Sequence, residues 1–141
     1  MSIKSDYQEQ TAALMAKYSR DRAMSLAVGG DFENLGLVER ELLILCGLKP
    51  EHFLIDVGCG SGRLTQHLTQ YVTRYLGTDV VPELLEQARS FGPGFQFVEV
   101  DGLSIPAQDS EADFVCFFSV LTHLRHEESY NYLREALRVT K

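Results

Sequence analysis

The second half of the chain alternates short apolar runs with segments of helical periodicity. The apolar runs, which are typical of buried strands, lie at residues 53–57, 74–79, 95–100 and 113–118. The helical segments lie at residues 63–70, 82–90 and 127–139, and the inward positions expected in the last of them are Tyr130, Leu133, Leu137 and Val139. Because strands that alternate with helices form parallel sheets, we predict an α/β fold, a doubly wound parallel sheet with helices on both faces.

The first 48 residues carry helical patterns. Ser5 and Gln8 have the spacing of a capping box, which predicts a helix from Ser5 to about Tyr18. Asp31 can cap a second helix, which ends before Gly47. The apolar positions that recur at three- and four-residue spacing in this second helix are Leu35, Val38, Leu42 and Leu45. We therefore divide the chain into an N-terminal helical segment, residues 1–48, and a core, residues 49–141.

Composition limits the class of protein. The chain has 141 residues, of which 45% are apolar and 23% charged, as in one ordinary globular domain. Its net charge of -7 argues against a surface that neutralises nucleic-acid phosphates. No apolar run approaches the roughly 18 residues that a membrane helix needs. The N-terminus lacks a basic segment followed by an apolar one, so we expect no secretory signal and a cytoplasmic protein.

Cysteine and histidine positions give no sign of a disulfide framework or a metal site. Cys46, Cys59 and Cys116 are odd in number and widely spaced, which predicts free thiols in a reducing compartment. His123 and His126 lie close in sequence, but two ligands without a third are usually a coincidence. We therefore expect no bound metal.

A glycine-rich loop follows the first predicted strand. Gly58, Gly60 and Gly62 alternate with other residues between this strand and a helix. Glycine allows a tight turn and lets a ligand approach bare backbone, and the N–H groups at the start of the following helix favour a negative group. The alternative is a tight turn without a ligand, so the loop alone does not establish a binding site.

Two acidic positions after the next strands support a ligand site. Asp79 ends the second predicted strand 21 positions after Gly58, the spacing at which an acid accepts hydrogen bonds from ribose hydroxyls. Asp101 and Gly102 follow the third strand, at the same end of the sheet. There the Asp101 carboxylate could accept from an adenine amino group, and the backbone N–H of Gly102 or Leu103 could donate to a ring nitrogen. In combination, these positions predict an adenosine site.

Several segments in this order resemble the class I S-adenosylmethionine-dependent methyltransferases, of the type that acts on small molecules. The segment Phe53–Thr65 is similar to the family's first signature. Tyr75–Asp79 resembles its ribose-binding strand end, and Phe97–Gly102 its adenine-binding segment. Asp113–Leu124 is similar to the fourth strand and the loop beneath the transferred methyl group, and Leu133–Lys141 to the helix before the next glycine turn.

This resemblance implies a Rossmann-like fold, S-adenosyl-L-methionine as cofactor, and methyl transfer to a nucleophilic atom of a small-molecule acceptor. Asp56 would support the loop and the methionine amino end of the cofactor. The positions at which the resemblance implies cofactor contacts are Asp56, Gly58, Cys59, Gly60, Gly62, Asp79, Val80, Asp101, Gly102, Leu103 and Ser119. His123 is the one candidate general base, because histidine is the side chain best suited to accept a proton near neutral pH; the alternative is that it only shapes its loop.

The resemblance also bears on the two ends of the chain. In similar enzymes an N-terminal segment folds over the cofactor, so residues 1–48 are a candidate lid, with Tyr7, Tyr18 and Phe32 as its aromatic surface. The family's usual sheet has seven strands, so we expect a chain truncated after the fourth strand and its helix. The uncovered fourth strand would then be a sheet edge through which another subunit could pair, giving a homo-oligomer.

Two other functions remain open at this point. A methyltransferase-like module could hold the cofactor without turnover. A nicotinamide dehydrogenase has its third glycine three positions after the second, where this chain has Arg63, so that reading is disfavoured.

Overall fold

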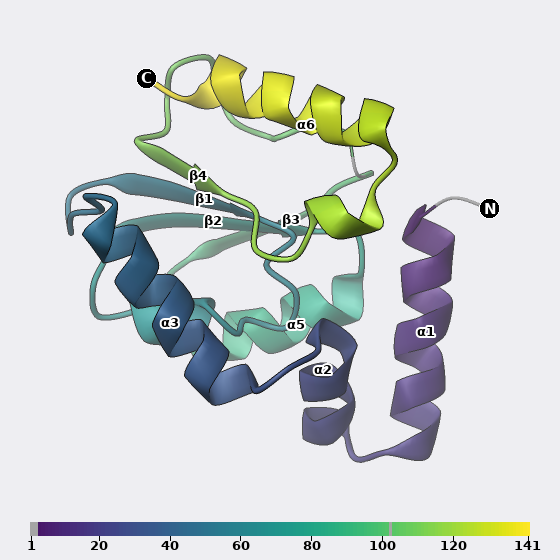
Figure 1. Cartoon of the computed structure of the whole chain (residues 1–141). Helices are drawn as coiled ribbons and strands as arrows, with labels where there is room; N and C mark the ends of the chain where they lie inside the picture. The colour runs from purple at the N-terminus through teal and green to yellow at the C-terminus, as the bar shows by residue number, and fades with distance from the viewer. Residues whose placement is uncertain (1–2, 102) are drawn as a thin grey trace.

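A parallel sheet forms the centre of the molecule, with helices on both of its faces (Figure 1). The structure is a computed structural model and describes residues 3–101 and 103–141. The strands are β1 (Phe53–Val57), β2 (Arg74–Asp79), β3 (Gln96–Glu99) and β4 (Phe114–Cys116), paired in the order β3-β2-β1-β4. All three pairings are parallel. The predicted α/β fold is confirmed, and each strand lies within its predicted range.

The central strand β1 separates two apolar layers. Its five residues are all buried, because neighbouring strands cover both edges and helices cover both faces. Leu54 points into a cluster with residues of α3 (Phe32–Leu45), α4 (Thr65–Leu68) and α5 (Pro82–Phe91). Phe53, Ile55 and Val57 point into a second cluster, with residues of α6 (His126–Val139). This alternation gives the three-layer arrangement of Figure 1.

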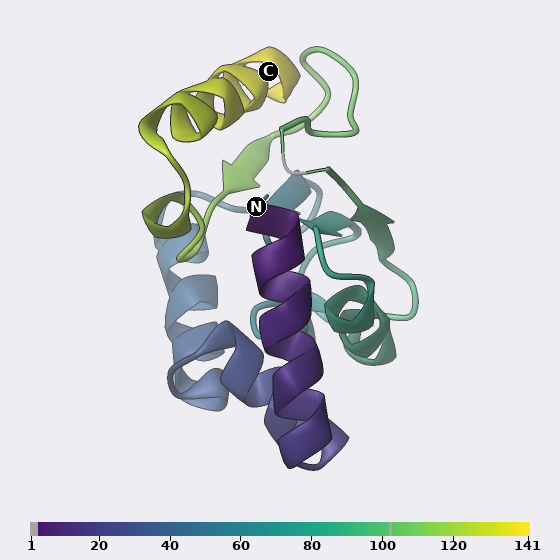
Figure 2. The same cartoon turned by 90° about the vertical axis from the view of Figure 1, so that its right-hand side faces the viewer.

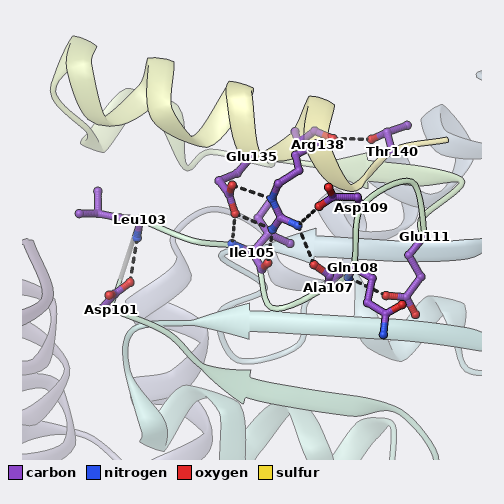
Figure 3. Close-up of polar contacts among 11 residues, drawn as sticks. Asp101, Leu103, Ile105, Ala107, Gln108, Asp109, Glu111, Glu135, Arg138 and Thr140 are labelled. Atoms are coloured by element: carbon purple, nitrogen blue, oxygen red, sulfur yellow. Dashed lines mark hydrogen bonds and ion pairs between the residues drawn. The ribbon is translucent and has the colours of Figure 1, made fainter.

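The crossover from β3 to β4 runs through an extended segment over the α6 face of the sheet (Figure 3). Arg138 of α6 holds this segment. Its guanidinium donates to the carbonyl oxygens of Ile105 (3.0 Å) and Ala107 (2.9 Å) and pairs with the carboxylates of Glu135 and Asp109, both at 2.8 Å. Arg138 therefore ties this segment to α6.

Two helices, α1 (Ile3–Lys17) and α2 (Arg20–Val28), precede α3 and lie at one end of the sheet. Figure 2 shows α1 crossing in front of that end. The predicted capping box is wrong, because Ser5 lies inside α1, which extends at least to Ile3. Asp31, in contrast, caps α3 as predicted, and its carboxylate accepts from the Asn34 N–H at 3.2 Å.

The apolar face predicted for α3 points outward. Leu35, Val38 and Leu42 are exposed, and Leu45 is 84% exposed. The buried side consists of Gly36, Glu39 and Leu43. Gly36 must face inward, because a Cβ there would lie 2.3 Å from the Arg63 carbonyl oxygen. The spacing of these residues correctly places them on one side of the helix. It does not show whether that side packs against the sheet.

The same reversal occurs in α6. Tyr130 and Leu133 are exposed and Leu137 is 79% exposed, so the prediction of an inward face is wrong for these three. Val139 is buried as predicted, together with Tyr132, whose ring meets that of Phe117 edge-on at 5.9 Å. Within the described residues, every helix is too short or too polar to cross a membrane.

The helix after the glycine loop and the three cysteines were also predicted from the sequence. The helix predicted over residues 63–70 is shorter, because only Thr65–Leu68 is helical and the preceding glycine loop continues as turns through Leu64. The three cysteines are free thiols, as predicted.

Candidate functional site

The glycine loop, residues 58–62, joins β1 to α4 and is fastened to the end of β2. The N–H groups of Gly58 and Cys59 both donate to the Thr78 carbonyl oxygen, at 2.8 and 2.9 Å. Gly60 and Gly62 have φ angles of 55° and 93°, a region that side chains rarely adopt. A Cβ at Gly62 would also lie 2.9 Å from the Ala88 Cα of α5. The loop therefore presents bare backbone in a fixed conformation.

Asp79 stands beside this loop at the end of β2. One carboxylate oxygen accepts from the Gly60 N–H at 2.9 Å and the other from the Val81 N–H at 3.0 Å. Burial raises the pKa of Asp79, although these N–H groups favour the charged form. A carboxylate has about four acceptor positions, so each oxygen keeps one for a further donor. This geometry suits a ligand with two adjacent hydroxyl groups.

Asp56 lies beneath the loop in β1 and is buried. The Tyr75 hydroxyl donates to one of its carboxylate oxygens at 2.8 Å, and the Cys116 thiol donates to the other at 3.6 Å. Thr65 extends this chain of side chains through a 2.9 Å hydrogen bond with the Tyr75 hydroxyl. Burial raises the pKa of Asp56 to about 6, against the opposing effect of the Tyr75 hydrogen bond. The carboxyl group is thus held by β2 and β4, the strands on either side.

A cavity of about 440 Å³ opens at the carboxyl ends of the strands. It brings together residues from four separate segments of the predicted site. The predicted residues that line it are Asp56, Gly58, Cys59, Gly60, Asp79, Val80, Asp101, Leu103, Ser119 and His123. Gly62 lies instead against α5, and Gly102 lies outside the described residues.

The turn after β3 uses one of the predicted donors internally. The Leu103 N–H donates to the Asp101 carboxylate at 3.1 Å (Figure 3). A base that accepted from Leu103 would have to replace or share this bond. Asp101 is exposed on the cavity wall, so its second oxygen can face a ligand amino group.

His123 lies at the mouth of the cavity, in the short helix η1 (Leu121–His123). Its ring meets the Tyr7 ring of α1 edge-on, with centroids 5.7 Å apart. Of the three aromatic residues predicted for the lid, Tyr7 alone is a cavity residue. Tyr18 lies beside Lys17, and Phe32 packs against Phe91. Ser119, which begins this mouth segment, has a φ of 61°, a strained conformation for a residue with a side chain.

Several cavity residues were not found by sequence reasoning. They come mainly from the N-terminal helices and from the start of α6, and they are Lys4, Val28, Glu39, Arg63, Arg125, Glu128 and Tyr132. Each is an ordinary residue in a helical pattern, and only the fold brings it to the cavity. Arg63 alone carried a signal, because it occupies the position where a dinucleotide fingerprint has glycine.

Together, the cradle, the two acids and the cavity fit an adenosine cofactor. The backbone of Gly58 and Gly60 borders the cavity, and Asp79 and Asp101 line the same cavity. Within the described residues, no group of three or more His, Cys, Asp or Glu side chains could hold a metal ion. The fold and the site therefore define an α/β domain that binds a nucleotide-type cofactor.

Comparison with known proteins identifies the family. A family model described as a methyltransferase domain matches residues 55–141, more than half of the chain. The chain therefore belongs to this methyltransferase family, and the resemblance drawn from its motifs is confirmed. Its cofactor is S-adenosylmethionine.

Individual relatives agree on the family but differ in their substrates. The chain is 40% identical over 63 residues to trans-aconitate 2-methyltransferase of Escherichia coli, a match that covers 43% of this chain and 25% of the relative. It is 34% identical over 70 residues to tRNA (carboxymethyluridine(34)-5-O)-methyltransferase of Saccharomyces cerevisiae, covering 49% of this chain and 24% of the relative. The chain thus matches only about a quarter of the length of these relatives.

A solved structure shows the same fold. Magnesium protoporphyrin IX methyltransferase of Synechocystis, solved with bound S-adenosylmethionine, superposes on all of this chain with a TM-score of 0.73. The superposition covers 73% of that enzyme, at 17% sequence identity.

Proposed function

We propose that this chain forms the cofactor-binding part of a methyltransferase that methylates a small molecule. The observation that carries the proposal is that the Asp79 carboxylate, the glycine loop and His123 line one shared cavity. An acceptor that bound beside His123 would share this cavity with a methyl donor held by the loop.

The residues that would hold the cofactor follow from the geometry. Asp79 would accept from the ribose hydroxyls, Asp101 from the adenine amino group, and the backbone of Gly58 and Gly60 would border the methionine part. Asp56 would support the amino end. When bound, the cofactor supplies a methyl group on a positively charged sulfur, which is already a strong electrophile.

This chain's own contribution is to align and enclose the reactants. Holding two groups in a reactive geometry can supply roughly 7–11 kcal/mol in favourable cases. Helix α1 supports this role as a lid, because Tyr7 meets His123 at the cavity mouth. His123 would accept a proton from an acceptor that arrives protonated, and for a deprotonated acceptor it would only shape the mouth.

The acceptor is proposed to be a small molecule because of charge and cavity size. A net charge of -7 opposes binding of a polyanion such as tRNA, and the cavity volume suits a cofactor with a compact acceptor. The relative named for trans-aconitate acts on a small acid, which makes small acids the first class to test. The free thiols support a reducing compartment such as the cytoplasm.

A binding module without turnover is the alternative function. In such a module the cavity would retain the cofactor but lack an acceptor site. The relatives that the chain matches are named as methyltransferases, so the comparisons favour an enzyme over this alternative.

Transfer of a radioactive methyl group from S-adenosylmethionine tests the proposal. The purified chain is offered a panel of small acids that includes trans-aconitate, and tRNA in a parallel reaction. We expect label in a small acid. Because a carboxylate acceptor is already deprotonated, His123→Ala should change the rate little with these acids and should lower it only with an acceptor that arrives protonated. Label in tRNA instead would contradict the small-molecule proposal, and cofactor binding without any transfer would favour the binding module.

A further inference from the structure

The glycine loop also contacts the N-terminal helices, which contribute residues to the same cavity. The Ser61 hydroxyl donates to the Met24 carbonyl oxygen in α2 at 2.9 Å, and both residues are buried. A Cβ at Gly60 would lie 2.4 Å from the Val28 side chain. The last turns of α2 therefore pack directly onto the loop backbone.

Arg63 makes the strongest contacts at this junction. Its guanidinium donates through two nitrogens to the Glu39 carboxylate in α3, and both side chains are buried. A third nitrogen donates to the carbonyl oxygens of Val28 and Gly29, at 3.3 Å each. These carbonyls end α2, where a helix has unpaired acceptors and a partial negative charge. Arg63 thus caps α2 from within the loop segment while Glu39 fixes its orientation.

The position of α2 in turn determines the position of α1. Tyr7 of α1 packs in one apolar cluster with Met24 and Ala27 of α2. The same α1 places Lys4 and Tyr7 in the cavity wall and brings Tyr7 against His123. Contacts that hold α2 on the loop therefore help to hold α1 over the cavity, together with the direct contacts of Lys4 with Glu99 and of Gln8 with the Val80 carbonyl oxygen.

We propose that Ser61, Arg63 and Glu39 form a latch that fastens the lid, helices α1 and α2, to the cofactor loop. Arg63 is then a positioning residue. It acts on the cavity through α2. When a cofactor binds and makes the loop more rigid, Arg63 makes the lid more rigid as well. This inference rests on the proposed function in one respect, namely that the cofactor lies in the glycine loop.

A matched control is available on the opposite face of the sheet. Arg138 also pairs with carboxylates and donates to two backbone carbonyls, but it holds the β3–β4 crossover rather than the lid. Arg63→Met and Arg138→Met therefore remove similar contacts, namely ion pairs with carboxylates and hydrogen bonds to two carbonyl oxygens. Both variants should lose some overall stability. Only the first should release α1 and α2.

Amide hydrogen exchange over residues 3–28 tests the latch, with and without S-adenosylhomocysteine. We expect the ligand to slow exchange there about tenfold or more in the parent chain and in Arg138→Met, which is about 1.4 kcal/mol or more of local protection. In Arg63→Met the lid should exchange about tenfold faster than in Arg138→Met even without ligand, and ligand should not restore the protection. Arg63→Lys, which keeps a cation near the α2 carbonyls, should restore part of it. Equal lid exchange in the two Met variants would overturn the latch.

A double variant separates the latch from simple stability. Replacing a buried ion pair with apolar residues often restores stability, so Glu39→Leu/Arg63→Met should regain overall stability while the lid stays unprotected. Full lid protection in this variant would also contradict the latch. If ligand fails to bind the parent chain, the proposed function fails, whereas the comparison without ligand still decides on the latch.

Discussion

At the residue scale, the most unusual group is the Asp56 carboxyl. It is buried in the central strand, and its pKa is raised from 3.8 to about 6 chiefly by that burial. The groups that face it are Tyr75, Cys116, Glu39 and Asp79. A buried acid of this kind is costly for the fold, and its position under the glycine loop points to a role in the ligand site.

Asp56→Asn should therefore stabilise the chain and weaken cofactor binding. A folded-state pKa above the unfolded value means that stability is fully present below pH 3.8 and is lost as pH rises through about 6. Above pH 6 the variant should gain on the order of 2 kcal/mol in unfolding free energy, somewhat less than the full shift because the Tyr75 hydroxyl loses a charged acceptor. Urea unfolding of both proteins from pH 4 to 8 measures this difference. A gain that does not change between pH 4 and 6 would contradict the assigned cause.

Some residues of the site could be predicted from the sequence and others could not. Asp79 and the glycine loop were found because their chemistry is encoded in a short sequence and a fixed spacing. Glu39 and Lys4 were not, because their place at the cavity follows from helix packing that no local pattern reveals. The sequence predicted only one role for Gly60, contact with the cofactor. In the structure, its lack of a side chain also leaves room for the Val28 side chain.

At the scale of elements, strands were predicted more reliably than helix faces. An apolar run such as Phe53–Val57 is buried on both sides, so its location already gives its environment. For α3 the spacing of Val38 and Leu45 was read correctly, but these residues face outward. The face toward the sheet contains Gly36 and Glu39, neither of which is a large apolar residue. Gly36 lies there because the helix backbone packs closely against Arg63, and Glu39 because it forms an ion pair with Arg63.

Two substitutions in α3 test this corrected orientation. Leu43 is 6% exposed in the core, whereas Val38 is 62% exposed. Leu43→Ala should lower the unfolding free energy by about 2–4 kcal/mol, because it leaves a cavity. Val38→Ala should change it by less than about 0.5 kcal/mol. Urea unfolding measures both, and a larger loss in Val38→Ala than in Leu43→Ala would contradict the orientation seen in the structure.

At the scale of the whole molecule, β4 is one of the two edge strands of the sheet. Within residues 3–101 and 103–141, the one isolated bridge outside the four strands joins Ala112, which precedes β4, to Thr140. The outward stripes of α3 and α6 lie on opposite faces of the sheet (Figure 1). Uncovered strand edges and large apolar patches favour association with another chain.

We therefore expect the isolated chain to associate in a concentration-dependent way and to bind apolar dyes. Leu45→Lys combined with Leu137→Lys should reduce both effects without loss of helical content, because both side chains are mostly exposed. Light scattering across a dilution series and dye fluorescence provide the readouts. A monomer at all concentrations, with no dye bound, would contradict an accessible edge.

The central claim is that the loop and Asp79 form a site for S-adenosylmethionine. Calorimetric titration with S-adenosylhomocysteine and with NAD, on the parent chain and on Asp79→Asn, tests it most directly. We expect S-adenosylhomocysteine to bind and NAD not to bind. In Asp79→Asn the affinity for S-adenosylhomocysteine should be about 10- to 100-fold weaker, because the charged hydrogen bonds to the ribose are lost. Tighter binding of NAD, or an unchanged affinity in the variant, would contradict this claim.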